Sequence, residues 1–348
     1  MSLLDSTSAM ISKNKILILL LFVSTSFSQE VKWMSIGDLH NWYSAAGCEI
    51  ETGRTGQVSD QQDGLRFPAF YRVQDNQAAK GLWLGATNFY DPVVNKDYEY
   101  KVIHAGPRHL DIENETMPVD MTMDGKYDHP NVFVDGDPAT NLQYLDNVDN
   151  VDPSLPSDRR INNIVQTSIG VQMKRTIYAF SHPEHQNYHI QEYVFTNNGC
   201  FDADCNTSYE QTLEGFQVYL QYRYAISREG MVYDGNWLPQ SAAWGHNTMN
   251  DVIGEHPNVP SINDQYYDNG EIMRALFSWQ GYHSDASFDN LGGPNAPGDG
   301  HLGAAQFVGV VTLHADTSPT DNTDNINQPS TCLLYRSPSP RDSSPSRM

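Results

Sequence analysis

Basic residues are scarce in this chain. Its 348 residues include 21 Lys and Arg but 43 Asp and Glu, which gives a formal net charge of −22 at pH 7. A field of this sign repels the phosphates of nucleic acids and the anionic headgroups of lipids. The composition therefore argues against nucleic acid and against an anionic membrane surface as partners, whereas cations remain chemically suitable ligands.

Long apolar runs are also missing. The N-terminal run Ile16–Val23 is far too short to cross a bilayer. Lysines precede it and small, polar residues follow it, which is the pattern of a secretory signal peptide over residues 1–28. We therefore expect an exported protein, extracellular or on the outer cell surface, with no transmembrane span.

Cysteine is rare, with four residues in the whole chain. Cys200 and Cys205 bracket a short loop, and an oxidising exterior would let them close a local disulfide. Cys48 is then unpaired, either buried or joined to a part of the protein beyond this sequence. No second cysteine or histidine pair lies nearby at zinc spacing, so a metal site is the weaker interpretation of these cysteines.

Motifs of known catalytic centres are absent. There is no G-x-S-x-G nucleophile elbow, and no Gly-rich loop between a strand and a helix to hold phosphate. His182 and His185 flank Pro183 in a turn and do not match H-E-x-x-H, so we interpret them as turn and surface histidines. We assign no catalytic residue and favour a protein that is not an enzyme.

The strand signals that are present centre on Ser168–Tyr224. Three runs rich in β-branched and aromatic residues are separated by Ser-His-Pro-Glu and Asn-Asn-Gly, which predicts consecutive antiparallel strands. Clean alternation over Phe216–Tyr224 indicates a half-buried strand. We predict an all-β fold, an antiparallel β-sandwich core with long irregular loops and few short helices. Leu39–Ala46 is considered as a brief helix, although the segment is too short for its pattern to decide.

Composition divides the chain into five parts. We predict a signal peptide, an N-terminal β-rich unit, a β-sandwich domain, a polar linker and a non-native tail, at residues 1–28, 29–120, 121–315, 316–331 and 332–348 respectively. The tail begins CLLYRSPSPRD and turns abruptly from acidic to basic. It resembles the translation of a transposase sequencing adapter, so we expect the natural protein to continue beyond Thr331.

The best candidate for a metal site is the acidic segment LDNVDNVDPSLPSD. It places Asp146, Asp149 and Asp152 three residues apart, and oxygen-rich loops of this kind suit calcium. The spacing is not that of an EF-hand, and a solvated Asp/Asn turn is the simpler alternative. Asp202 and Asp204 form a second, weaker calcium candidate. Calcium is the one cofactor that we consider.

The aromatic region 237–282 is the second candidate site. It contains Trp237, Trp244, Tyr266, Tyr267 and Trp279, whose flat rings beside Asn and Asp could stack on sugars. The alternative is that these rings pack the long loops onto the β core, where aromatic burial contributes strongly to stability. We favour the packing interpretation.

Several segments together carry a family resemblance, among them WMSIGDLHNWYSAAGCE, QAAKGLWLGATNF, YKVIHAGPR, DPSLPSDRRI, IYAFSHPEHQNYHIQEYVFTNNG and GAAQFVGVVTLHADTS. They resemble a family of large, exported marine-bacterial proteins, many of which end in a type IX secretion sorting domain. The resemblance implies export and supplies no activity or catalytic residue. We therefore expect a secreted or cell-surface β-sandwich protein with a non-catalytic binding or structural role, whose partners are glycans or other surface proteins. The alternative is a carbohydrate-active enzyme or glycan-binding protein that uses region 237–282.

Overall fold

The computed structural model describes residues 30–50, 65–70, 76–106, 115–129, 133–138, 146–224, 232–233, 236–237, 248–253, 274–280, 300, 307–318 and 320–325. The predicted signal peptide and adapter-derived tail lie outside these residues, as do Trp244, Tyr266 and Tyr267. Within the described ranges every regular element is a strand, so no helix there is long and apolar enough to cross a membrane.

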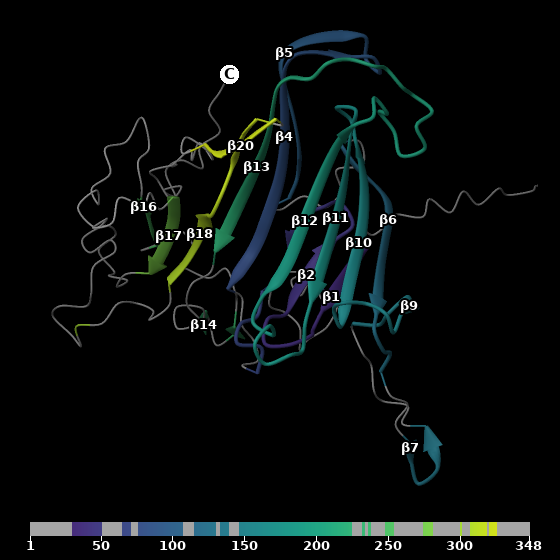
Figure 1. The fold of residues 1–348 in the computed structure, drawn as a ribbon, viewed down its shortest axis with the longest axis vertical. Coiled ribbons are helices and arrows are strands. Elements are labelled where there is room, and N and C mark those ends of the chain that lie inside the picture. The colour runs from purple at the N-terminus through teal and green to yellow at the C-terminus, as the bar shows by residue number, and fades with distance from the viewer. Residues whose placement is uncertain are drawn as a thin grey trace, which may run out of the picture.

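One sheet has five strands in the order β12-β11-β10-β6-β9 (Figure 1). Their bounds are β6 Thr116–Gly125, β9 Asn150–Val151, β10 Arg159–Thr167, β11 Val171–Ala179 and β12 His189–Asn197. All neighbours are antiparallel except β6 and β9, which are parallel. The consecutive strands β10, β11 and β12 form a meander, as β-rich runs separated by turn residues predict.

A second sheet is built on a long central strand. Its bounds are β3 Glu49–Ile50, β4 Gln77–Asp91, β5 Lys96–Ala105 and β13 Glu214–Tyr224. β13 pairs with one edge of β4, whereas β5 and β3 follow each other along the opposite edge. The register places Glu49 opposite Lys80, and Leu82 opposite Leu220.

The N-terminal strands form a hairpin of β1 Val31–Met34 and β2 Asn41–Ser44. The brief helix considered over Leu39–Ala46 is therefore wrong. Trp42 and Tyr43 are aromatic residues, which favour strands. The segment is too short to show its own period, so pairing with β1 determines its structure. Trp33 and Trp42 face each other across the hairpin, with ring centroids 4.8 Å apart.

The inner face of the five-stranded sheet is covered by two different elements. One buried cluster joins it to the second sheet and includes Leu82, Leu84, Phe89, Ile103, Val165, Val171 and Met173. The other joins it to the hairpin and includes Met34, Tyr43, Met121, Met123, Ile161 and Ile177. The prediction of an all-β fold with antiparallel sheets is confirmed. The β-sandwich stays a prediction, because a hairpin and not a second sheet covers part of this face.

A polar pair lies at the junction of these two clusters. Asn163 of β10 and Arg175 of β11 are register partners, and both side chains are fully buried. Arg175 donates to the carbonyls of Ser44 at 2.7 Å and Gly47 at 3.0 Å, and to Oδ1 of Asn163 at 3.0 Å. Nδ2 of Asn163 donates to the Ala45 carbonyl at 2.9 Å. These bonds attach the five-stranded sheet to the chain that links β2 to β3.

Strand pairing crosses the boundary predicted at residues 120/121. β6 contains that boundary, and β4 on one side of it pairs with β13 on the other. The two predicted units therefore contribute strands to one sheet. Composition along the chain cannot reveal such pairing, because the paired strands are far apart in the sequence.

The other described strands form smaller sheets. Their bounds are β7 Phe133–Val134, β8 Asp137–Pro138, β14 Val232–Tyr233, β15 Asn236–Trp237, β16 Thr248–Ile253, β17 Arg274–Gln280, β18 Phe307–Thr312, β19 Asp316–Ser318 and β20 Asp321–Asp324. β16, β17 and β18 form a three-stranded antiparallel sheet. The segment predicted as a polar linker, residues 316–331, begins with the β19–β20 hairpin.

Candidate functional site

Two clusters of reactive side chains stand out, one buried and one exposed. The buried cluster begins with the β3–β4 register, which sets Glu49 opposite Lys80. Nζ of Lys80 lies 3.0 Å from Oε1 of Glu49, and the residues are only 8% and 3% exposed respectively. Charged residues are seldom this buried unless they are paired. The ion pair between Glu49 and Lys80 is what allows both charges to lie between the sheets.

Three amides complete the surroundings of Glu49. Its Oε2 accepts hydrogen bonds from Nδ2 of Asn41 at 2.7 Å and Nε2 of Gln77 at 2.8 Å. Its Oε1 accepts from Nε2 of Gln191 at 3.0 Å, in addition to Lys80. Gln191 belongs to β12, so this carboxylate connects the second sheet to the edge strand of the five-stranded sheet.

The charges of the pair stabilise each other. Burial by itself would raise the pKa of Glu49, but the charge of Lys80 and hydrogen bonds from Gln191 and Lys80 outweigh it and hold that pKa below its ordinary value. Burial would likewise lower the pKa of Lys80, but the charge of Glu49 and the nearby phenols of Tyr193 and Tyr222 raise it. The pair is therefore ionised at neutral pH.

Lys80 and Tyr193 both donate to the side-chain carbonyl of Gln191. Oε1 of Gln191 lies 3.3 Å from Nζ of Lys80 and 2.9 Å from the hydroxyl of Tyr193. Nζ of Lys80 also lies 3.3 Å from that hydroxyl, and 5.3 Å and 5.8 Å from the ring centroids of Tyr193 and Tyr222. An amine, an amide, a carboxylate and a phenol are thus joined by hydrogen bonds in a site where Glu49 and Lys80 are buried and Gln191 and Tyr193 are half-buried.

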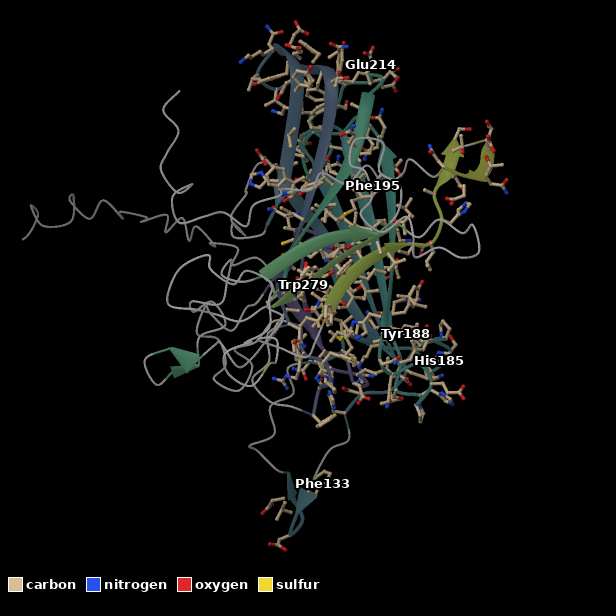
Figure 2. All side chains as sticks on the ribbon, turned by 90° about the vertical axis from the view of Figure 1, so that its left-hand side faces the viewer. Phe133, His185, Tyr188, Phe195, Glu214 and Trp279 are labelled. Atoms are coloured by element: carbon tan, nitrogen blue, oxygen red, sulfur yellow. A yellow bond between two sulfur atoms is a disulfide. The ribbon has the colours of Figure 1, made fainter. Side chains whose placement is uncertain are left out.

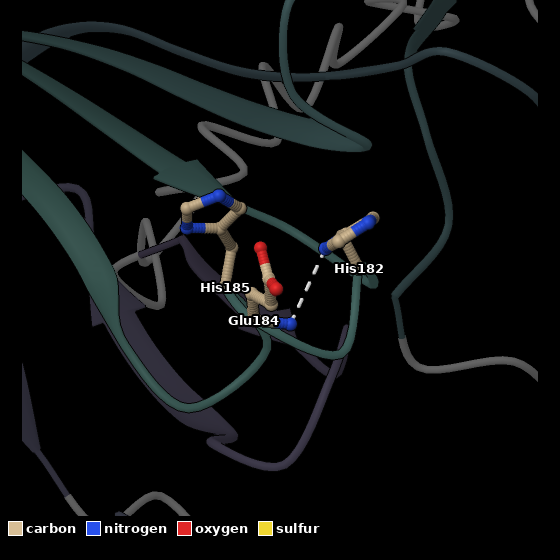
Figure 3. Close-up of side chains that lie close together, drawn as sticks. All are labelled: His182, Glu184 and His185. Atoms are coloured by element: carbon tan, nitrogen blue, oxygen red, sulfur yellow. Dashed lines mark hydrogen bonds between the residues drawn. The ribbon is translucent and has the colours of Figure 1, made fainter.

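The exposed cluster lies in the turn between β11 and β12. His182, Glu184 and His185 offer ligand atoms that all lie within 4.8 Å of one another, and all three residues are exposed (Figure 3). The turn is closed by a hydrogen bond from the His185 amide to the His182 carbonyl at 2.8 Å. In Figure 2, His185 and Tyr188 lie well below Glu214, between it and Phe133.

Hydrogen bonds orient both imidazoles of the turn. Nδ1 of His185 lies 2.5 Å from the hydroxyl of Tyr188, which leaves its Nε2 available as a ligand. Nδ1 of His182 accepts a 3.2 Å bond from the Glu184 amide, marked by the dashed line in Figure 3. Two imidazoles and one carboxylate are a donor set that suits zinc with an open position. Within the part of the chain that the structure describes, no other three such residues come together in this way.

The histidines were predicted as turn and surface residues, and both are exposed in a turn. Their gathering with Glu184 was missed because H-P-E-H is not a known metal motif and the turn conformation cannot be read from spacing. The available signal was Pro183, because its ring restricts the backbone between His182 and Glu184 and so favours a tight turn that brings the two imidazoles near each other.

The three predicted calcium ligands have separate partners. Asp146 lies 2.7 Å from Nε2 of His129, and Asp149 lies 2.9 Å from Nζ of Lys32. Asp152 accepts from the Ser154 amide at 2.9 Å, and its pKa is lowered by hydrogen bonds from Ser154. Their carboxylates do not form a ligand group of the kind seen at the histidine turn among the described residues. The calcium site stays a prediction.

The second calcium candidate, the Asp202 loop, is held by its own backbone. Carboxylate oxygens of Asp202 accept from the amides of Asn206 at 2.9 Å and Thr207 at 2.6 Å, and these bonds lower its pKa. Cys200 and Cys205 are joined by a disulfide across this loop, with Cα atoms 4.8 Å apart. Cys48 is a buried free cysteine.

Of the aromatic candidates, Trp279 is the one whose ring contacts can be described. It stacks on Phe277 at 5.7 Å and lies 6.3 Å from Phe307, its cross-strand partner on β18. Phe307 is 59% exposed, and Phe277 and Trp279 are half-buried, so the three rings form a partly exposed aromatic strip along β17 and β18. Trp237 lies on the two-residue strand β15.

Comparisons with protein-family models, with curated proteins and with solved structures found no match for this chain. The function must therefore be argued from the chemistry of the clusters described above.

Proposed function

We propose that this chain is a secreted or cell-surface β-rich protein with a non-catalytic binding role, and that the turn containing His182, Glu184 and His185 binds a divalent transition-metal ion. The observation that supports it is the gathering of three ligand atoms within 4.8 Å on an exposed turn. The N-terminal signal pattern and the Cys200–Cys205 disulfide support export, because disulfides persist outside the reducing cytoplasm.

The donor set favours zinc, copper or nickel over calcium. Imidazole nitrogen suits these metals, whereas calcium takes six or more oxygen ligands. The bond from the Glu184 amide to Nδ1 of His182 places the proton of the neutral ring on Nε2. Binding through Nε2 would require that proton to move to Nδ1, which breaks the bond from the Glu184 amide. Protons compete with the metal for imidazole nitrogen, so we expect metal affinity to weaken as the pH falls.

Zinc titration of the purified, tag-free chain by calorimetry tests this proposal. We expect one saturable site that is lost in His182→Ala and in His185→Ala. Tyr188→Phe removes the hydroxyl beside His185 and should weaken binding about tenfold, as outer-sphere partners of metal ligands do. His314→Ala is the control, because His314 is an exposed histidine in the connection between β18 and β19. Equal zinc binding by wild type and both alanine variants at the turn would refute the proposal.

Glycan binding is a second candidate, supported by the aromatic strip of Phe277, Trp279 and Phe307. Electrophoresis in gels that contain soluble polysaccharides should show retardation that Trp279→Ala removes and Tyr100→Ala keeps, since Tyr100 is a 68% exposed aromatic on β5. Release of reducing sugar in a parallel assay would favour the carbohydrate-active enzyme instead. If no polysaccharide in the gels retards the protein, glycan binding is excluded for the polysaccharides tested.

A further inference from the structure

The cluster of buried Glu49 and Lys80 with half-buried Gln191 and Tyr193 has the parts that an amide-forming reaction needs. Lys80 supplies an amine, and its Nζ already bonds the side-chain carbonyl oxygen of Gln191 at 3.3 Å. The carboxylate of Glu49 bonds both the amine of Lys80 and the amide nitrogen of Gln191, each at 3.0 Å. The nucleophile and the leaving group therefore share one proton acceptor.

The carbonyl of Gln191 is also polarised. The hydroxyl of Tyr193 donates to Oε1 at 2.9 Å, where negative charge would develop if the carbonyl carbon were attacked. Such a donor gains strength as water becomes scarcer: Glu49 and Lys80 are 3% and 8% exposed, and Gln191 and Tyr193 are half-buried. The hydrogen bonds hold the reactants together, which removes most of the entropic cost of an encounter.

We propose that Lys80 and Gln191 form an intramolecular isopeptide bond that joins β4 of one sheet to β12 of the other. Nζ of Lys80 attacks Cδ of Gln191, and the electron pair of the carbonyl moves to Oε1 beside Tyr193. When the carbonyl re-forms, the bond from Cδ to Nε2 breaks and ammonia leaves. One amine and one primary amide become one secondary amide and one ammonia, with no change of oxidation state and no further reactant.

Glu49 moves the proton in this scheme. The resting lysine is an ammonium, so it must first give a proton to the carboxylate 3.0 Å away, and Glu49 then returns a proton to the departing nitrogen of Gln191. The attacking Nζ still carries one proton more than an amide nitrogen, so the regenerated carboxylate of Glu49 accepts that proton, which finally leaves with the ammonia as ammonium. The neutral amine is a minor species because the ion pair is stabilised. Loss of ammonia is irreversible in dilute solution, however. Even a small population of neutral lysine is therefore enough to convert the protein to the linked form over time.

The choice of Gln191 over its neighbours follows from the contacts. Gln77 and Asn41 also donate to Glu49, but through Oε2, and the bond from Lys80 to an amide carbonyl goes to Gln191. Gln77→Ala is therefore a matched control that removes a Glu49 partner and leaves the reacting pair. Lys80→Arg and Gln191→Ala each remove one reactant.

Mass spectrometry of the purified full chain, after disulfide reduction and prolonged incubation of the folded protein, tests the proposal. We expect an intact mass lower than that of the sequence by one ammonia. Tryptic digestion should yield residues 73–96, uncleaved after Lys80, covalently linked to residues 176–223. Gln77→Ala should keep this link, whereas Lys80→Arg, Gln191→Ala and Glu49→Gln should lose it, with circular dichroism to check that each variant is folded.

The proposal is overturned if the folded wild type keeps its full mass and gives two separate peptides. A mass lower by one water, with Lys80 linked to the peptide containing Glu49, would also overturn it, because the carboxylate would then be the electrophile. A link that forms equally fast in folded Glu49→Gln would refute the proton transfer assigned to Glu49. The wild-type peptide map decides the main point even if a variant does not fold.

Discussion

Arg175 is the residue whose replacement the fold should tolerate least. It is fully buried, and its guanidinium holds the carbonyls of Ser44 and Gly47 and the amide oxygen of Asn163 at 2.7–3.0 Å. Arg175→Met keeps much of the volume but leaves these three acceptors without their donor. Each buried unsatisfied polar group costs about 1–3 kcal/mol, and part of that is recovered by relaxation, so we expect a loss of about 3–5 kcal/mol.

Urea unfolding followed by circular dichroism measures this loss. The midpoint should fall while the slope with denaturant stays constant, which indicates lower stability without a change in the surface exposed. Lys174→Met is the matched control, because Lys174 is the preceding residue on β11 and is exposed. Its stability should stay within about 0.5 kcal/mol of wild type.

Arg175→Lys separates charge from geometry. Lysine keeps the positive charge but lacks the planar fork that reaches several acceptors at once, so it should recover only part of the loss. A loss below about 1 kcal/mol for Arg175→Met would refute the reasoning, since the acceptors would then be satisfied by other groups or by water. The junction between the two core clusters would in that case not depend on this guanidinium.

Two further predictions concern pH and the disulfide. Burial lowers the pKa of His189 from 6.5 to about 4, so the unfolded state takes up this proton first as the pH falls. Stability should therefore decrease between pH 6.5 and 4 by up to about 3 kcal/mol, and urea unfolding of His189→Gln should show a flatter pH profile; parallel profiles would contradict this. The Cys200–Cys205 disulfide closes a short loop, so the double variant Cys200→Ser, Cys205→Ser should lose about 2 kcal/mol in urea unfolding, and unchanged stability would show that the loop is held by Asp202 alone.

Strands with their own periodicity could be predicted from the sequence. Phe216 and Leu220 pack against the core as the alternation in β13 indicates, although Val218 between them is 42% exposed. β2 could not be predicted, because its four residues are all buried and show no alternation. Such a segment becomes a strand through its partner β1, which is tertiary information.

The buried site was beyond sequence reasoning for a related reason. Glu49 and Lys80 look like ordinary surface charges, and only the β3–β4 register brings them together. Asn163 and Arg175 interrupt the apolar alternation of β10 and β11, which in a sequence is read as exposure. In both cases the polar side chains are buried because partners from distant segments satisfy them, and no local pattern encodes those partners.

The pairing of β4 with β13 has a consequence for how the chain matures. The partner of Leu82 is Leu220, so the second sheet is not complete until most of the described chain is available. Folds dominated by such distant pairings fold slowly, in about milliseconds to seconds. The chain loses entropy when it closes a long loop, and this loss comes before the stabilising contacts between the paired strands have formed. Until β13 is available, the edge of β4 that pairs with it stays unpaired, so the last strand of this sheet to be made decides when the sheet is complete.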